Sequence, residues 1–196
     1  MIYRIVRFIL RVYFGLLYRL EVKGLENIPA DGPVILCANH ISLKDPPVVG
    51  IPLDRKVHYM AKEELFRIPG FGWLIKQLGA FPVKRGGVSK ESIRNAIGLL
   101  KNNHVMGIFP EGTRKNPGGM GKKGASMLAL KSNATVIPVA VVGDYTLFRK
   151  MRVYYGKPID LSPYKEGGSD QLEAATEAIM QTIRAMVAEH KNDRKN

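Results

Sequence analysis

A histidine and an aspartate stand five positions apart in the stretch CANHISLKDPP, residues 37–47. A helix would place two such side chains on different faces, and a strand would place them on opposite sides. A turn can bring His40 and Asp45 together, and Pro46 disfavours helical backbone at the residue before it. An aspartate bonded to one imidazole nitrogen fixes the tautomer and makes the other nitrogen a better proton acceptor. The pair therefore predicts a general base that needs no serine, the alternative being that Asp45 caps a helix that begins at the prolines.

A second segment with charged and glycine residues is IFPEGTRKNPGG, residues 108–119. Apolar residues lead into it, and the loop that follows carries Glu111, Thr113 and Arg114. A guanidinium group in such a loop can hold a phosphate through two parallel hydrogen bonds, with loop amides assisting. The segment therefore predicts an anion site, the alternative being a surface turn whose charges are solvated.

Further cations could complete that site. Lys62 and Arg85 each end a predicted strand, and Lys122 and Lys123 follow the glycine-rich loop closely. Taken one at a time, such residues are more often solvated surface charges. Lys62 and Arg85 could join Arg114 in a cationic pocket.

The composition indicates one globular domain with an excess of positive charge. Of the 196 residues, 45% are hydrophobic and 24% charged, and the net charge is +13 with a pI near 9.9. Such a surface expects an anionic partner, which could be nucleic acid, acidic lipid or an acidic carrier protein. The single cysteine, Cys37, excludes an intrachain disulfide and fits a reducing compartment, and its apolar surroundings predict a buried, inert thiol.

The amino-terminal segment, residues 1–22, has arginines inside a broad apolar pattern. Arg4, Arg7 and Arg11 recur at helical spacing in MIYRIVRFILRVYFGLLYRL, which is too interrupted to span a bilayer. An arginine-striped helix with a wide apolar face is suited to a membrane interface. The alternative is an ordinary helix that packs on the domain with its arginines in solvent, and a break near Gly15 into two helices stays open.

The remainder of the chain, residues 23–196, alternates short apolar runs with helical patterns. This order predicts a single α/β domain whose largely parallel or mixed sheet is flanked by helices. The expected strands lie at 33–40, 57–62, 80–85, 104–110, 135–143 and 153–161. The expected helices include one capped by Ser89, a short one at 125–131 and a long one at about 170–190.

Four of these segments together resemble the motifs of the glycerolipid acyltransferases. NHISLKD is similar to the NHxxxxD motif, and GAFPVKR, FPEGTR and VIPVA resemble the three motifs that follow it, in the same order. The resemblance covers roughly residues 20–160. The bacterial branch that acylates 1-acyl-glycerol 3-phosphate is the most similar one.

The resemblance implies roles for these residues. His40 would be the general base for the sn-2 hydroxyl of lysophosphatidic acid, and Asp45 would orient it. The resemblance also implies a set of residues whose side chains or backbone bind the phosphate of the acceptor. They are Lys62, Arg85, Glu111, Gly112, Thr113, Arg114 and Lys123. No metal and no cofactor are implied. The acyl group would come from a thioester of coenzyme A or acyl-carrier protein, and backbone amides would form an oxyanion site.

The resemblance also implies a place for the enzyme. Because the acceptor is an anionic lipid, the protein would lie peripherally on an anionic membrane surface, at the cytoplasmic face of the cell membrane. Basic residues near such a surface each contribute about 1 kcal/mol to docking. The positive charge of the chain would then be explained without nucleic acid, which is not expected as a partner.

Rival functions remain open at this point. A nucleic-acid-binding module would account for the charge, but the aromatic residues are not interleaved with the basic ones as a stacking platform requires. A binding module that kept the fold without catalysis would not need His40 and Asp45. Within the family, glycerol 3-phosphate or another lysolipid could replace lysophosphatidic acid as the acceptor. A serine hydrolase is poorly supported, because the sequence contains no GxSxG segment.

Overall fold

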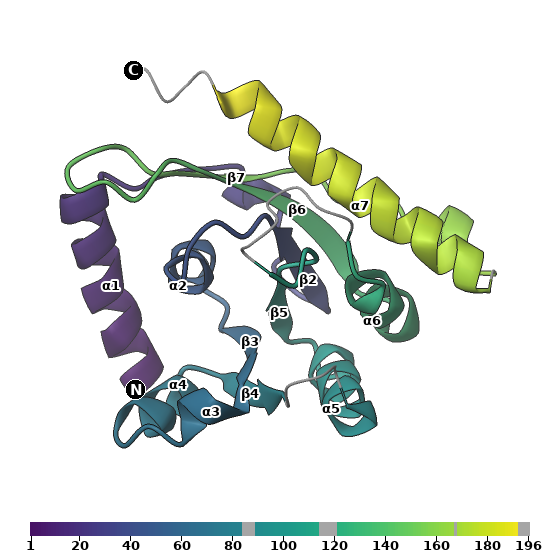
Figure 1. Cartoon of the computed structure of the whole chain (residues 1–196), viewed down its shortest axis with the longest axis horizontal. Coiled ribbons are helices and arrows are strands. Elements are labelled where there is room, and N and C mark those ends of the chain that lie inside the picture. Colours follow the sequence, from purple (N-terminus) through teal and green to yellow (C-terminus); the bar gives the residue numbers. More distant parts are fainter. Residues whose placement is uncertain (84–88, 114–120, 167, 192–196) are drawn as a thin grey trace.

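The computed structural model describes residues 1–83, 89–113, 121–166 and 168–191. These residues form a seven-stranded sheet in the order β1-β7-β6-β2-β5-β3-β4 (Figure 1). The strands are β1 Glu21–Lys23, β2 Val34–Ala38, β3 Val57–Lys62, β4 Ala80–Val83, β5 Val105–Ile108, β6 Thr135–Val142 and β7 Arg152–Tyr155. All neighbours pair in parallel except β6 and β7, which are antiparallel. The predicted α/β domain with a mixed sheet is thereby confirmed.

Helices cover both faces of this sheet. They are α1 Ile2–Tyr18, α2 Asp45–Gly50, α3 Glu63–Phe66, α4 Phe71–Gln77, α5 Lys90–Lys101, α6 Gly124–Ser132 and α7 Ser169–Glu189, with short 3-10 turns at Leu25–Asn27 and Ser162–Tyr164. Helices α1 and α2 lie on one side and α5, α6 and α7 on the other (Figure 1). Ser89 caps α5 as expected, since its hydroxyl accepts a hydrogen bond from the Ser92 amide.

The central strand β2 belongs to both hydrophobic cores. All five of its residues are buried, and alternate side chains point to opposite faces of the sheet. Val34, Leu36 and Ala38 join the core beneath α1 and α2, whereas Ile35 and Cys37 join the core beneath α5, α6 and α7. A strand buried on both faces reads as an unbroken apolar run, which is why the sequence predicts it.

Cys37 is fully buried within this strand. Burial raises the pKa of its thiol to about 12, because the charged thiolate is disfavoured away from water. The thiol is therefore held in its unreactive protonated form, in line with its apolar sequence context.

The parallel strands bring their carboxyl ends to one edge of the sheet. Strands β6, β2, β5, β3 and β4 are adjacent and parallel, so the segments that follow them meet at that edge in this order. Open parallel sheets carry their ligands at such an edge. The predicted base follows β2 and the predicted anion loop follows β5, which makes them neighbours.

Helix α1 is one continuous helix through Gly15, and it packs on the domain. Phe14 and Tyr18 are 2% and 3% exposed and lie in the same core as α2. The carbonyl groups at its carboxyl end accept hydrogen bonds from the amides of Phe148 and Met151, which precede β7. Strand β1, which the sequence pattern did not predict, then continues directly from α1 into the sheet and spans residues 21–23.

Two of the arginines of α1 bind the domain. Arg7 donates a hydrogen bond to the Leu53 carbonyl, and Arg11 donates to the carbonyl of Ile51 over 2.6 Å. Both guanidinium groups also face Asp54. They therefore attach α1 to the segment between α2 and β3, which differs from the solvated arginines of a surface helix.

The opposite face of α1 is apolar and exposed. Its side chains recur at helical spacing and belong to Ile5, Phe8, Ile9, Val12, Tyr13 and Leu16. Phe8 and Leu16 are 67% and 70% exposed. None of the described helices is both long and apolar enough to cross a bilayer.

Candidate active site

His40 and Asp45 meet in the turn between β2 and α2. Nδ1 of His40 lies 2.8 Å from Oδ2 of Asp45. Because an ionised carboxylate only accepts hydrogen bonds, Nδ1 carries the proton and Nε2 is the basic nitrogen. In the part of the chain that the structure describes, Nε2 has no hydrogen-bond partner, and the His40 side chain is 17% exposed. The turn thus fixes one imidazole nitrogen and leaves the other available to a ligand.

The Asp45 carboxylate is fully buried and accepts several hydrogen bonds. Its Oδ2 accepts from the amides of Ile41 and Ser42, each over 2.7 Å, as well as from His40. Its Oδ1 accepts from the Tyr145 hydroxyl over 2.6 Å. A buried carboxylate needs such donors in place of water, and here they also fix its orientation.

The prolines explain how one residue can belong to a helix and to a dyad. Helix α2 begins at Asp45, with Pro46 and Pro47 in its first turn, where their missing N–H groups cost nothing. The alternative of a helix beginning at the prolines is therefore realised, but the Asp45 side chain makes no cap. It points back to the turn that precedes the helix.

The ring of Phe109, the residue that follows β5, stacks on the imidazole. Its centroid lies 4.2 Å from that of His40, with 23° between the two planes. The ring of Tyr59 in β3 stacks in turn on that of Phe109, with the two ring centroids 6.2 Å apart. Gly107 makes room for the tyrosine, since a Cβ there would lie 2.0 Å from the Tyr59 ring. The phenylalanine of FPEGTR therefore contacts His40.

Asn39 joins the turn to β6. Its side-chain amide donates to the Val141 carbonyl over 3.0 Å and accepts from the Val141 amide over 2.7 Å. These two bonds extend the ladder between β2 and β6 by one step beyond Ala38. The asparagine of the motif therefore fixes the point at which the chain leaves the sheet.

The predicted anion loop begins where β5 ends. Glu111 is buried, whereas Gly112 and Thr113 are exposed. Gly112 has a φ of +64°, and a Cβ on it would lie 2.7 Å from Cε of Lys122. The Lys122 amide in turn donates to the Pro110 carbonyl over 2.8 Å. The loop is thereby held to the segment before α6, with the Lys122 side chain against its glycine.

The other predicted cations lie in different places. Lys62 is exposed at the carboxyl end of β3, two strands from β2 and so about 10 Å away. Lys123 points to α7, where its ammonium donates to the Ser169 hydroxyl and lies 3.0 Å from Glu173. Arg85 and Arg114 lie outside the described residues.

Several residues of this site were missed in the sequence. They are Asn39, Phe109 and Tyr145. The tyrosine could have been found, because GDYT follows the strand VIPVAVV and a parallel strand there ends at the same edge. The stacked phenylalanine carries no such signal, since an apolar residue at a strand end is ordinarily a core residue.

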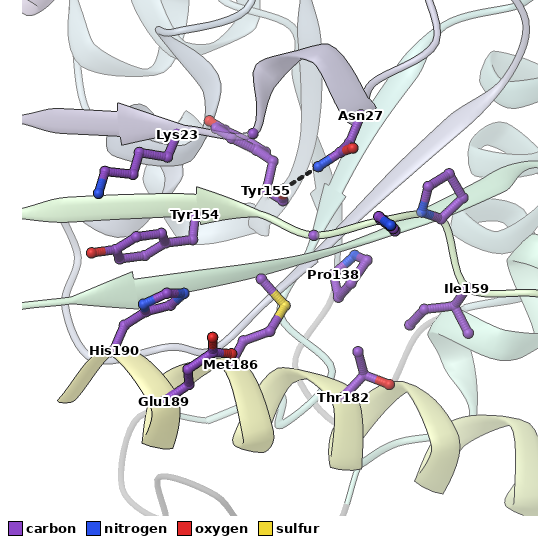
Figure 2. Close-up of a pocket in the computed structure, with 14 residues that line it drawn as sticks. Lys23, Asn27, Pro138, Tyr154, Tyr155, Ile159, Thr182, Met186, Glu189 and His190 are labelled. Carbon is purple, nitrogen blue, oxygen red and sulfur yellow. Dashed lines mark hydrogen bonds between the residues drawn. The ribbon is translucent and has the colours of Figure 1, made fainter.

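A groove of about 550 Å³ lies elsewhere, on the α7 side of the sheet (Figure 2). Pro138, Tyr154 and Met186 are among its lining residues. His190, which also lines it, stacks on Tyr154 with the ring centroids 3.6 Å apart. The neighbours of the dyad pack instead against the core beneath α1 and α2. The groove is therefore separate from the candidate active site.

Comparisons with known proteins agree with this arrangement. Residues 19–142 match the model of the Acyltransferase family. A curated relative from Bacillus subtilis, a 1-acyl-sn-glycerol-3-phosphate acyltransferase, is 34% identical, with 90% of this chain and 92% of the relative covered. One of the same description from Streptococcus pneumoniae is 31% identical, over 87% of this chain and 68% of the relative.

A solved structure is similar over nearly the whole chain. It is the crystal structure of the 1-acyl-sn-glycerophosphate acyltransferase PlsC from Thermotoga maritima, with a TM-score of 0.72 and 30% sequence identity. The alignment covers 96% of this chain and 79% of that protein. With its fold, its paired histidine and aspartate and the extent of the family match, the chain belongs to the acyltransferase family.

Proposed function

We propose that the chain transfers a fatty acyl group from an acyl thioester to the sn-2 hydroxyl of 1-acyl-glycerol 3-phosphate, which makes phosphatidic acid for phospholipid biosynthesis. The observation that carries the proposal is the His40–Asp45 pair at the carboxyl edge, beside the glycine loop that follows β5. Relatives with the corresponding name support the choice of acceptor.

His40 acts as the general base in this reaction. Its Nε2 takes the proton of the sn-2 hydroxyl as the oxygen attacks the thioester carbonyl. The tetrahedral intermediate then collapses, the carbon–sulfur bond breaks, and the thiolate takes up the proton from the imidazolium. Asp45 stays ionised throughout and stabilises that imidazolium through Nδ1. Thiolates leave readily because the pKa of a thiol is near 8.5.

The phosphate of the acceptor lies on the β5 side of the base. The glycerol phosphate is short, so its anion must bind one strand away from His40 rather than several. The Glu111–Thr113 loop follows β5, and Phe109 of the same segment touches the imidazole. Lys122 lies against that loop, and Lys62 can approach from β3 with its long side chain. Arg85 and Arg114, from the same motifs, complete the proposed anion site.

Lys123 is the least favoured of the predicted phosphate ligands. Its ammonium lies 3.0 Å from the Glu173 carboxylate and also donates to Ser169. A cation already paired with a carboxylate offers less charge to a phosphate. Lys122 takes its place in the proposal, because it lies over Gly112.

The exposed face of α1 is the proposed membrane contact. Its six apolar side chains would enter the lipid interface, while Arg7 and Arg11 keep the helix attached to the domain. Docking is peripheral, at the cytoplasmic face of the cell membrane. The net charge of +13 favours an anionic surface and would also attract an acidic acyl-carrier protein, the alternative donor to acyl-coenzyme A.

A panel of acceptors tests the proposed reaction. The purified full-length chain is given a long-chain acyl-coenzyme A or acyl-carrier protein in mixed micelles with 1-acyl-glycerol 3-phosphate. Matched samples contain glycerol 3-phosphate or a lysolipid whose phosphate carries a choline. We expect phosphatidic acid from the first acceptor at a kcat/KM at least about tenfold above the others, because only it offers both a lipid chain and a free phosphate monoester. Preference for another acceptor would contradict the proposed substrate.

A charged substitution on α1 tests the membrane contact. Phe8→Glu should lower binding to vesicles that contain anionic phospholipid, since a carboxylate would replace a ring at the lipid interface. Leu25→Glu, a similar change at an exposed leucine outside α1, is the control. Equal sedimentation of Phe8→Glu and wild type with vesicles would show that this face does not contact lipid. Truncation of α1 is less suitable, because Phe14 and Tyr18 belong to the core.

A further inference from the structure

We propose that Tyr145 is a positioning residue for the base, and that Lys44 and Tyr18 of α1 hold it in place. The inference rests on the proposed function of His40 and Asp45. It concerns Tyr18, Tyr145 and Lys44, of which Lys44 stands at a variable position of the NHxxxxD motif.

Tyr145 controls the side of the Asp45 carboxylate that faces away from His40. Its hydroxyl lies 2.6 Å from Oδ1, and within the described residues this oxygen has no other hydrogen-bond partner. Oδ2 by contrast accepts three hydrogen bonds, one of them from the imidazole. With Oδ1 fixed, the plane of the carboxylate is defined, and Oδ2 stays directed at Nδ1. Burial next to the carboxylate also raises the pKa of Tyr145 well above its usual value, so the phenol remains a donor.

The backbone at Tyr145 has a conformation that costs energy. Its φ is +54°, in the left-handed region that residues with a Cβ rarely adopt. The Tyr145 amide faces the sulfur of Met151 at 3.3 Å rather than a carbonyl. Residues held in such backbone conformations are concentrated at functional sites, where their surroundings impose the geometry. Here the strained turn directs the phenol to Asp45.

Lys44 connects this phenol with α1. Its ammonium donates to the Tyr18 hydroxyl over 2.6 Å and lies 4.6 Å from the centre of that ring. The same ammonium is 5.5 Å from the centre of the Tyr145 ring, and the two rings meet edge to face at 5.9 Å. A cation between two aromatic rings attracts both of them. The position of Tyr145, and through it that of Asp45, therefore depends on the carboxyl end of α1.

The consequence is a link between the lipid-facing helix and the base. Tyr18 is buried on one side of α1, while Phe8 and Leu16 are exposed on the other. A shift of α1 would change the place of the Tyr18 hydroxyl and of the ammonium bonded to it. The helix that is proposed to dock on lipid thus sets the geometry of proton transfer.

Steady-state kinetics of Tyr145→Phe test the first part of the proposal. The change keeps the ring and removes the hydrogen bond to Oδ1. We expect kcat to fall about tenfold to a hundredfold, as for the loss of a hydrogen bond to a charged group, with both KM values within about twofold of wild type. A kcat equal to wild type, or a rise in KM alone, would overturn the positioning role.

Tyr155→Phe is the matched control. Its hydroxyl is also buried and donates over 2.7 Å, but to the Val49 carbonyl in the core. This variant should melt at a lower temperature than wild type and keep its kcat within about twofold. An equal loss of kcat in both variants would show that Tyr145 acts only through stability.

Lys44→Met tests the connection to α1, because it keeps the length of the side chain and removes the cation between the rings. We expect kcat to fall about threefold at unchanged KM, a smaller effect than in Tyr145→Phe. A kcat equal to wild type would overturn the connection. Should Tyr145→Phe fail to fold, the result for Lys44→Met decides the proposal as a whole.

A readout without turnover separates this proposal from the proposed function. The Nδ1 proton of His40 can be followed by NMR in protein with labelled histidine, and assigned by its absence in His40→Ala. We expect slow exchange of this proton with water in wild type and in Tyr155→Phe, and faster exchange in Tyr145→Phe. Unchanged exchange in Tyr145→Phe would overturn the positioning role. If the wild type makes no phosphatidic acid, the proposed function fails. The exchange rate of the Nδ1 proton then decides by itself whether Tyr145 positions Asp45.

Discussion

Histidines occupy both edges of the sheet, and their surroundings differ. His40, at the carboxyl edge, is bonded to a buried carboxylate and stacked on Phe109. His58 lies near the beginning of β3, at the amino edge, where its Nδ1 faces the Gly79 carbonyl at 3.0 Å and its ring is 5.1 Å from that of His104. Burial, the largest cause, lowers the pKa of His58.

The difference shows that position and partner decide what a histidine can do. A carboxylate stabilises the imidazolium that forms during proton transfer, whereas a carbonyl and a second imidazole do so far less. The carboxyl edge is also where the segments after β2, β5 and β6 meet. Changes at this edge should therefore affect turnover, and changes at the amino edge should affect stability.

Asp45→Asn is expected to have the largest effect of the substitutions that sharpen this contrast. The amide would present an N–H group to some of the donors that now surround the carboxylate, and it cannot stabilise an imidazolium. We expect kcat to fall about a thousandfold, and the free energy of unfolding to fall by about 1–3 kcal/mol. Initial rates and urea unfolding measure the two quantities.

Asp160→Asn is the control for that substitution. Asp160 accepts a hydrogen bond from the Ser162 amide, but it is exposed and lies before a 3-10 turn. The kcat of Asp160→Asn should stay within about twofold of that of the wild type. A loss of activity as large as that of Asp45→Asn would contradict the special role of the buried carboxylate.

Lys62→Met and Lys122→Met should have smaller effects, and on a different constant. Each removes one exposed cation from the proposed phosphate site. We expect KM for 1-acyl-glycerol 3-phosphate to rise about fivefold in each, with kcat within about twofold, because binding rather than proton transfer is weakened. Lys131→Met, a change at an exposed lysine of α6, is the control. A loss of kcat at constant KM would place these lysines with the base instead.

His58→Gln should have the smallest effect, and on stability alone. Because the pKa of His58 is lower in the folded protein than its usual value near 6.5, the unfolded chain binds more protons just below that pH. The contribution of His58 to the free energy of unfolding is thus present above about pH 6.5, and it is lost as the pH falls through the pKa that His58 has in the folded protein. Urea unfolding between pH 5 and 8 should show a weaker acid loss in His58→Gln than in wild type. An unchanged profile, or a change in kcat at neutral pH, would break the contrast between the edges.

Local signals in the sequence were sufficient for much of the fold. The prediction for β3 at residues 57–62 matches its observed bounds, and the Ser89 cap begins α5. Both depend on neighbouring residues, through an apolar run or a capping hydroxyl. The contact of His40 with Asp45 was likewise predicted from one turn. Strand β1 was missed because three residues carry no periodic signal, and it forms only through its pairing with β7.

Contacts between distant segments were not predicted, because a local pattern does not contain the partner. Tyr145 is 100 positions from Asp45, and Phe109 reaches His40 only because β5 pairs with β2. Arg7 and Arg11 of α1 likewise have partners that are distant in the sequence. Their spacing predicted a helix, but the carbonyls that bind Arg7 and Arg11 come from the segment after α2. Which side of an arginine-containing helix faces the domain is thus decided by partners that the local pattern does not contain.

The central claim is that His40 is the base for acyl transfer. The most direct measurement is the formation of phosphatidic acid from a long-chain acyl thioester and 1-acyl-glycerol 3-phosphate, by wild type and by His40→Ala at equal concentration. Circular dichroism of both proteins establishes that the variant is folded. The account predicts product from the wild type and at least about a thousandfold less from the variant. Turnover by folded His40→Ala within about tenfold of wild type would contradict it.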